Sequence, residues 1–176
     1  MRKIQYMIRL GLLALCAVCA LSEVPAPSKA AELPPECSNI AVPNGIKKSH
    51  RFFAAGSQIY RWNGSTWDFV APSAELFADA GYDGKVGTHF AGPTWQSNSG
   101  SKVVARKIGD CTPDPSAIPW LLLEAITNDG PGMFAKTVLI QRVNTSGGLK
   151  PDLPGVIAGQ EAWMPYTAEY VFFSGK

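Results

Sequence analysis

The chain has 176 residues and carries 16 basic against 14 acidic side chains, a formal net charge of +2. Basic residues beyond the first thirty are scattered, so the sequence lacks the concentrated positive stripe that binding to a phosphate backbone requires, and we expect no nucleic-acid partner. The apolar run Leu10 to Leu21 is shorter than the roughly 20 residues of a membrane-spanning helix, and no longer run follows it. We therefore expect no transmembrane segment.

The N-terminus predicts a secretory signal over residues 1–30. Three basic residues among the first nine precede the apolar run Leu10 to Leu21, an order that is typical of export. Small side chains permit cleavage after Ala20, Ser22 or Ala30, and the sequence does not choose among them. Removing the signal takes away four basic residues and one acidic residue, which leaves 12 basic and 13 acidic side chains and a net charge of −1. We expect a periplasmic or extracellular protein.

Two of the four cysteines, Cys37 and Cys111, remain once the signal is removed. An even pair of cysteines in an exported protein predicts a disulfide. The bond would close a loop of 75 residues, counted inclusively, and would attach the N-terminal arm to the segment before Pro113. The alternative is two separate thiols, which an oxidising compartment disfavours.

The remainder of the chain predicts strands joined by tight turns. Two strand-like runs, 58–62 and 66–70, flank the turn Asn63-Gly64, the strongest hairpin signal that a sequence contains. β-branched and aromatic residues or polar–apolar alternation predict further strands. These are expected at 74–79, 85–90, 102–108, 119–127, 137–144 and 168–173. The run 119–127 also suits a short helix, and we predict it as a strand.

Proline and glycine interrupt the chain about every ten residues, and no stretch sustains the 3.6-residue apolar period of a stable helix. These features predict one all-β domain over residues 31–176, built as an antiparallel sandwich or a closed barrel of about eight to ten strands. Both architectures stay open, because the spacing of strands and turns suits either.

A first candidate site lies where the run 85–90 meets a Gly-Pro turn. Strand alternation puts His89 on the face opposite Val86 and Phe90, and the turn then brings Trp95 close to it. The pair could form the floor of a binding pocket. It could equally be a hydrogen-bonded histidine beside a packed tryptophan at a bend of the sheet.

A second candidate site surrounds Arg142, which strand alternation places on the same face as Val138 and Ile140. A buried arginine needs a partner, because an unpaired buried charge is costly. Two carboxylates, Glu124 and Glu161, are candidates for a structural ion pair. The alternative is an anion or sugar site formed by Gln141, Arg142 and Asn144.

The sequence contains no recognised catalytic or cofactor motif. Metal sites usually recruit His and Cys, yet the only histidines, His50 and His89, lie 39 residues apart, so we expect no metal. Neither a G-x-S-x-G elbow nor a Gly-rich nucleotide loop occurs, so we expect no serine hydrolase of the α/β type and no cofactor.

We therefore favour a noncatalytic exported module that binds a small molecule, a glycan or an envelope partner around His89, Trp95 and Arg142. Two alternatives stay open. One is a structural or stress-associated envelope protein, and the other is a hydrolase or isomerase that uses His89 with a carboxylate such as Glu124 or Asp79. The sequence indicates neither a reaction nor an oligomeric state.

Several strings spread over about Leu33 to Phe173 resemble the domain-of-unknown-function 3455 family. They are QIY from Gln58, WDFVAP from Trp67, GTHFAGPTW from Gly87, GSKVV from Gly100, AIPWLLL from Ala117 and IQRVNTSGG from Ile140. The family comprises exported bacterial and fungal proteins of unestablished activity, so the resemblance implies export and a shared fold and assigns no functional residue. Some fungal relatives are labelled malate dehydrogenase, but this chain has neither a G-x-G-x-x-G turn nor an alternation of strand and helix.

Overall fold

A computed structural model describes residues 33–175, and the predicted signal over residues 1–30, with its three cleavage sites, lies outside them. The described part begins with a short 3-10 helix, η1 (Pro35–Ile40), and continues as eight strands. The strands are β1 (Lys47–Trp62), β2 (Trp67–Phe77), β3 (Lys85–Phe90), β4 (Thr94–Ser97), β5 (Lys102–Cys111), β6 (Trp120–Asp129), β7 (Thr137–Gly147) and β8 (Glu161–Ser174).

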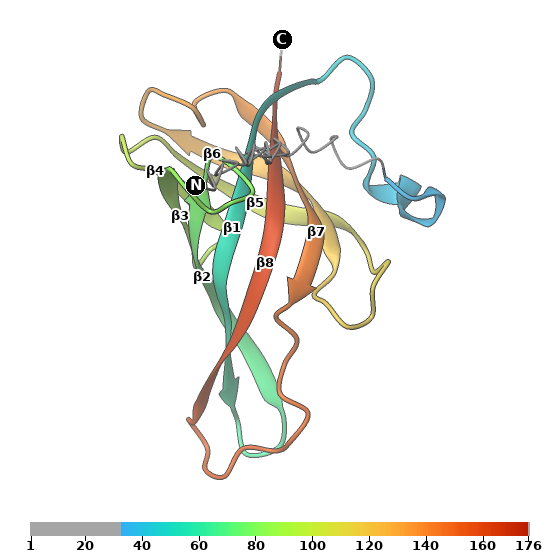
Figure 1. Cartoon of the computed structure of the whole chain (residues 1–176), viewed down its shortest axis with the longest axis vertical. Coiled ribbons are helices and arrows are strands. Elements are labelled where there is room, and N and C mark those ends of the chain that lie inside the picture. Colours follow the sequence, from blue (N-terminus) through green and yellow to red (C-terminus); the bar gives the residue numbers. More distant parts are fainter. Residues whose placement is uncertain (1–32, 176) are drawn as a thin grey trace, which may run out of the picture. The chain divides into compact units, whose positions relative to one another are not determined.

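The eight strands form one antiparallel sheet that closes on itself (Figure 1). Each strand pairs with the next in the chain, and β8 pairs back along β1 from Lys47↔Ser174 to Arg61↔Glu161. The predicted all-β antiparallel fold is confirmed. Because the first and last strands are hydrogen-bonded, the closed barrel is observed and the sandwich is not.

Two glycines permit neighbouring strands to approach closely. A Cβ atom at Gly56 of β1 would lie 2.2 Å from the carbonyl oxygen of Ser73 on β2. A Cβ atom at Gly87 of β3 would lie 2.3 Å from the carbonyl oxygen of Gln96 on β4. Any side chain at these positions would have to displace backbone, so the two glycines accommodate the bending that closure requires.

The barrel interior is packed with aromatic and aliphatic side chains near the start of β1. Phe52 of β1, Phe172 of β8 and Phe134 of the β6–β7 connection have ring centroids 4.7–6.1 Å apart. Phe134 is fully buried, and its backbone N–H donates to Ser101 Oγ over 3.1 Å. The β6–β7 connection therefore fills this end of the barrel.

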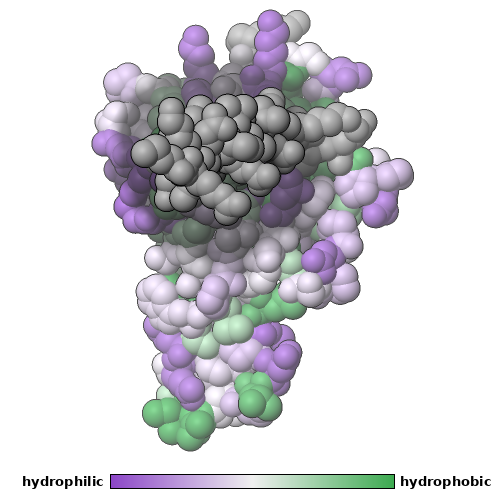
Figure 2. Space-filling model, viewed as in Figure 1, coloured by the Kyte–Doolittle hydropathy of each residue, from purple (hydrophilic) through white to green (hydrophobic). Residues whose placement is uncertain are grey.

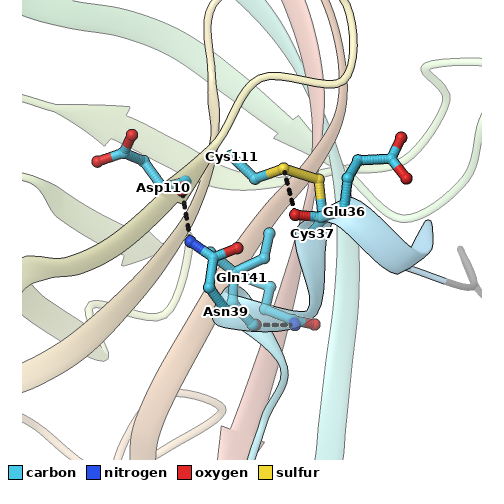
Figure 3. The surroundings of a disulfide bond; sticks show 7 residues. Glu36, Cys37, Asn39, Asp110, Cys111 and Gln141 are labelled. Atoms are coloured by element: carbon cyan, nitrogen blue, oxygen red, sulfur yellow. Dashed lines mark hydrogen bonds between the residues drawn. A yellow bond between two sulfur atoms is a disulfide. The ribbon is translucent and has the colours of Figure 1, made fainter.

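A second cluster lies outside the barrel, where η1 packs against the sheet. Cys37 and Ile40 of η1 contact Leu122 and Leu139, and all four side chains are buried. Cys37 is bonded to Cys111 of β5, with their Cα atoms 5.4 Å apart (Figure 3). The predicted disulfide is confirmed.

Apolar side chains outside both cores gather on the β7–β8 connection. Leu153, Val156 and Ile157 are 69–86% exposed. Figure 2 shows hydrophobic surface at the end of the barrel where this connection lies beside the β1–β2 hairpin. Over residues 33–175, no helix has the length and apolar character needed to cross a membrane.

Candidate functional site

A cavity of about 280 Å³ occupies the part of the barrel interior that the aromatic packing leaves unfilled. All eight strands contribute to its lining, from Gln58 on β1 to Tyr170 on β8. Phe69 and Lys107 are exposed to solvent and mark the mouth of the cavity. The walls are mostly apolar, with Phe69, Pro72, Pro93, Ile118, Pro119, Leu121 and Leu123 among them.

The predicted pair His89 and Trp95 lies in this wall. The two residues face each other across β3 and β4, and their rings stack with centroids 4.3 Å apart and planes 11° apart. Both side chains are buried, and the ring of Tyr170 meets both edge-on. Packing and cavity lining, which the sequence offered as alternatives, therefore occur together.

His89 is held as a neutral ring. Its Nδ1 lies 2.9 Å from the carbonyl oxygen of Thr94, and because a carbonyl only accepts, Nδ1 carries the proton and Nε2 is left as an acceptor. Burial lowers the pKa of His89 to about 3; the bond to Thr94 opposes this shift, and the charge of Arg142 adds a smaller lowering. The ring is thus uncharged at neutral pH.

The carboxylates suggested for a hydrolase or isomerase do not contact His89. Glu124 binds Arg106, its cross-strand neighbour on β5, and Asp79 accepts the backbone N–H groups of Gly81 and Asp83 in a turn. General acid–base chemistry requires the acid and the base within hydrogen-bond reach. The pairing of His89 with Glu124 or Asp79 that the enzyme alternative named is therefore not formed.

Arg142 also lines the cavity, but its expected ion pair is not formed. Its Nε and Nη2 donate to the carbonyl oxygen of Pro119 over 3.0 and 2.8 Å. Glu161 binds Arg61 and Glu124 binds Arg106, in each case directly across neighbouring strands. Both carboxylates therefore pair with the arginine directly across from them on the neighbouring strand. The prediction of an ion pair between Arg142 and either carboxylate is wrong.

The other two residues of the second candidate site do not join Arg142. Gln141 points to the opposite face of β7, where its Nε2 donates to the Ile40 carbonyl oxygen of η1 over 2.7 Å (Figure 3). Asn144 is exposed, with a φ of 49° at a register shift between Val143 and Ser146. The predicted convergence of Gln141, Arg142 and Asn144 is thus wrong.

The apolar row predicted beside Arg142 is also interrupted. Ile140 is fully buried in the barrel core, whereas Val138 is 36% exposed. A register shift between Thr137 and Leu139 changes the face that the first residues of β7 present.

Sequence reasoning missed the polar residues that β1 and β8 contribute to the cavity. Tyr60 donates its hydroxyl to the Gly148 carbonyl oxygen over 2.8 Å. The hydroxyl of Tyr170 lies 3.5 Å from that of Tyr166, which does not itself line the cavity. Gln58 is 2% exposed, and its Nε2 has no hydrogen-bond partner in the described chain. Alternation from Gln58 to Tyr60 was the available signal, since residues two apart on a strand share a face.

Unpartnered donors and the charge of Arg142, which has no carboxylate partner in the described chain, define the electrostatics of the cavity. Trp95 Nε1, like Gln58 Nε2, is buried without an acceptor among residues 33–175. The charge of Arg142 opposes the rise in pKa that burial gives Tyr60 and Tyr166. Lys107 at the mouth is bound to Asp110, with Nζ and Oδ1 2.8 Å apart. The described residues contain no group of three or more His, Cys, Asp or Glu side chains placed to hold a metal ion.

No curated protein and no solved structure matches this chain. A family model described as "Protein of unknown function (DUF3455)" matches residues 43–174, a range that contains all eight strands of the barrel. This match confirms the resemblance seen in the sequence strings, and the chain belongs to the DUF3455 family.

Proposed function

We propose that this protein is an exported, noncatalytic barrel that binds a small ligand in its interior cavity. The observation that carries the proposal is a cavity of about 280 Å³ with mostly apolar walls, lined also by Gln58 and Trp95, whose buried N–H groups lack acceptors in the described chain. Export is supported by the signal-like N-terminus and by the Cys37–Cys111 disulfide, which is typical of oxidising compartments.

The chemistry of the wall suits binding rather than catalysis. Buried N–H groups without partners are destabilising by about 1–3 kcal/mol each, so a ligand that supplies an acceptor to Gln58 or Trp95 gains an interaction that the described chain does not supply. Apolar ligand atoms against Leu121 and Leu123 gain about 25 cal/mol per Å² removed from water. His89 is neutral and engaged with Thr94, and no carboxylate lines the cavity to act with it.

The size of the cavity limits the ligand. Ligand pockets commonly measure about 300–1,000 Å³, and this one lies near the lower limit. A single aromatic ring or a short aliphatic chain with one polar group therefore suits it better than a long acyl chain or an oligosaccharide.

A cavity-filling variant tests the proposal. Leu121 lines the cavity, so Leu121→Trp should occupy the ligand's space, whereas Ile126→Trp places the same ring on the exposed face of the same strand. We expect phenylacetate or phenylacetamide, at about 100 times its dissociation constant, to stabilise the wild type and Ile126→Trp by about 2.7 kcal/mol. Leu121→Trp should lose this stabilisation, measured as the ligand-induced shift in melting temperature.

Two results of that measurement would contradict the proposal. The first is that neither compound shifts the wild-type melting temperature at millimolar concentrations. That result is expected of a purely structural envelope protein, the alternative that the exposed Leu153, Val156 and Ile157 favour. The second is that Leu121→Trp responds as fully as Ile126→Trp, which would place binding outside the cavity.

A further inference from the structure

Building on the proposed function, we infer that the ligand of the cavity is a small monocarboxylate with an apolar body, its carboxylate bound by Arg142, Gln58 and Trp95. These three residues lie on β7, β1 and β4 and line the same cavity. The inference adds the charge and polarity of the ligand to its location.

Arg142 supplies a positive charge that the protein does not neutralise. Two of the five N–H donors of its guanidinium are used at the Pro119 carbonyl oxygen, over 3.0 and 2.8 Å, which leaves three donors. Among residues 33–175 no carboxylate lies within ion-pair distance of Arg142. A partly buried charge in a mostly apolar cavity favours a bound anion over water or a neutral ligand.

Gln58 and Trp95 add neutral donors of the same polarity. Gln58 Nε2 and Trp95 Nε1 belong to side chains that are 2% and 1% exposed, and neither has an acceptor in the described structure. A carboxylate offers two oxygens with about four acceptor positions, which matches the free N–H groups of Arg142, Gln58 and Trp95. A sugar carries several hydroxyl groups, which would lie against mostly apolar walls in this cavity.

The remaining lining residues define the rest of the molecule. Phe69, Ile118, Leu121 and Leu123 enclose apolar volume, so the body of the ligand carries few polar atoms. The second cation at the cavity, Lys107, is bound to Asp110, so a second anionic group would have no unpaired cation to meet. A single negative charge on a compact apolar body is the best match.

Calorimetric titration at pH 7 tests the inference with phenylacetate and its neutral analogue phenylacetamide. We expect the wild type to bind phenylacetate at least tenfold more tightly than phenylacetamide. Arg142→Met should weaken phenylacetate binding by about 30-fold or more, since it removes one partner of a charge pair, and leave phenylacetamide binding within about threefold. The matched control Arg106→Met makes the same substitution on the exterior of β5 and should leave both affinities unchanged.

A second variant guards against a loss of binding through misfolding. Gln58→Met keeps the length of a buried side chain but removes an amide N–H that has no acceptor, so its melting temperature should equal or exceed that of the wild type. Its affinity for phenylacetate should nevertheless fall about tenfold. A structural role alone would predict the reverse, a lower melting temperature with unchanged affinity.

The outcomes separate this inference from the proposed function. Equal binding of phenylacetate and phenylacetamide, with Arg142→Met affecting both alike, would overturn the monocarboxylate while leaving a cavity that binds small molecules. Absence of binding by both compounds would overturn the inference together with the proposed function.

Discussion

The free energy of unfolding is expected to fall by about 4 kcal/mol as the pH is lowered from 6.5 to about 3, because over this range His89 takes up a proton in the unfolded chain but not in the folded one. Burial lowers the folded-state pKa of His89 to about 3, below the unfolded value of 6.5. Between these limits the unfolded state binds more protons, so stability rises with pH. The contribution is complete above pH 6.5 and is lost as the pH falls toward 3.

Urea denaturation over this pH range, with His89→Asn as the comparison, measures the effect. The Asn amide can donate to the Thr94 carbonyl oxygen as His89 Nδ1 does, but it does not titrate. All other titratable groups are common to both proteins, so their contributions cancel in the difference. We expect the wild type to lose several kcal/mol relative to His89→Asn on acidification, and parallel pH profiles would contradict the account.

Loss of the Cys37–Cys111 disulfide should lower stability by about 4 kcal/mol. The bond joins residues 74 apart in sequence, and on the chain-entropy model a loop of this length restricts the unfolded state by that amount. The melting temperature should fall by roughly 10–15 °C. The double variant Cys37→Ser/Cys111→Ser, followed by calorimetry, avoids the reductant.

The contacts that η1 keeps without the disulfide should hold Cys37→Ser/Cys111→Ser folded at 25 °C. Asn39 Nδ2 donates to the Asp110 carbonyl oxygen, and Gln141 Nε2 donates to the Ile40 carbonyl oxygen (Figure 3). Because these bonds and the packing of Ile40 persist, the barrel should stay folded at 25 °C with β-dominated circular dichroism. A decrease in melting temperature of less than about 3 °C would show that the loop is restricted by contacts other than the disulfide.

Local chemistry made much of the fold predictable. The Asn63-Gly64 turn lies between β1 and β2 as expected, and the cysteine pair is bonded. β4 was missed because its four residues, Thr94–Ser97, are too few to display alternation. The first half of β1 was missed because its basic residues and the Ala54-Ala55-Gly56 stretch have low strand propensity, which pairing with β8 overrides.

The candidate site was predictable only where alternation held. The turn after His89 predicted its contact with Trp95, whereas nothing in the spacing indicated that Arg142, from a third strand, would line the same cavity. Gln141 and Asn144 were misplaced because a neighbour in sequence faces the other side of a strand and because a register shift turns Asn144 outward. Alternation could place Gln58 on the same face as Tyr60, but its unsatisfied donor is recognised only when its surroundings are known.

The most direct test of the cavity as the ligand site is the indole N–H resonance of Trp95 in a proton–nitrogen NMR spectrum, assigned with Trp95→Phe. Phenylacetate should move this resonance downfield, because Trp95 Nε1 is buried without an acceptor and gains one. The indole of Trp67, which already donates to the Leu153 carbonyl oxygen, and that of the exposed Trp163 should stay in place. An unmoved Trp95 resonance at saturating phenylacetate would contradict the account.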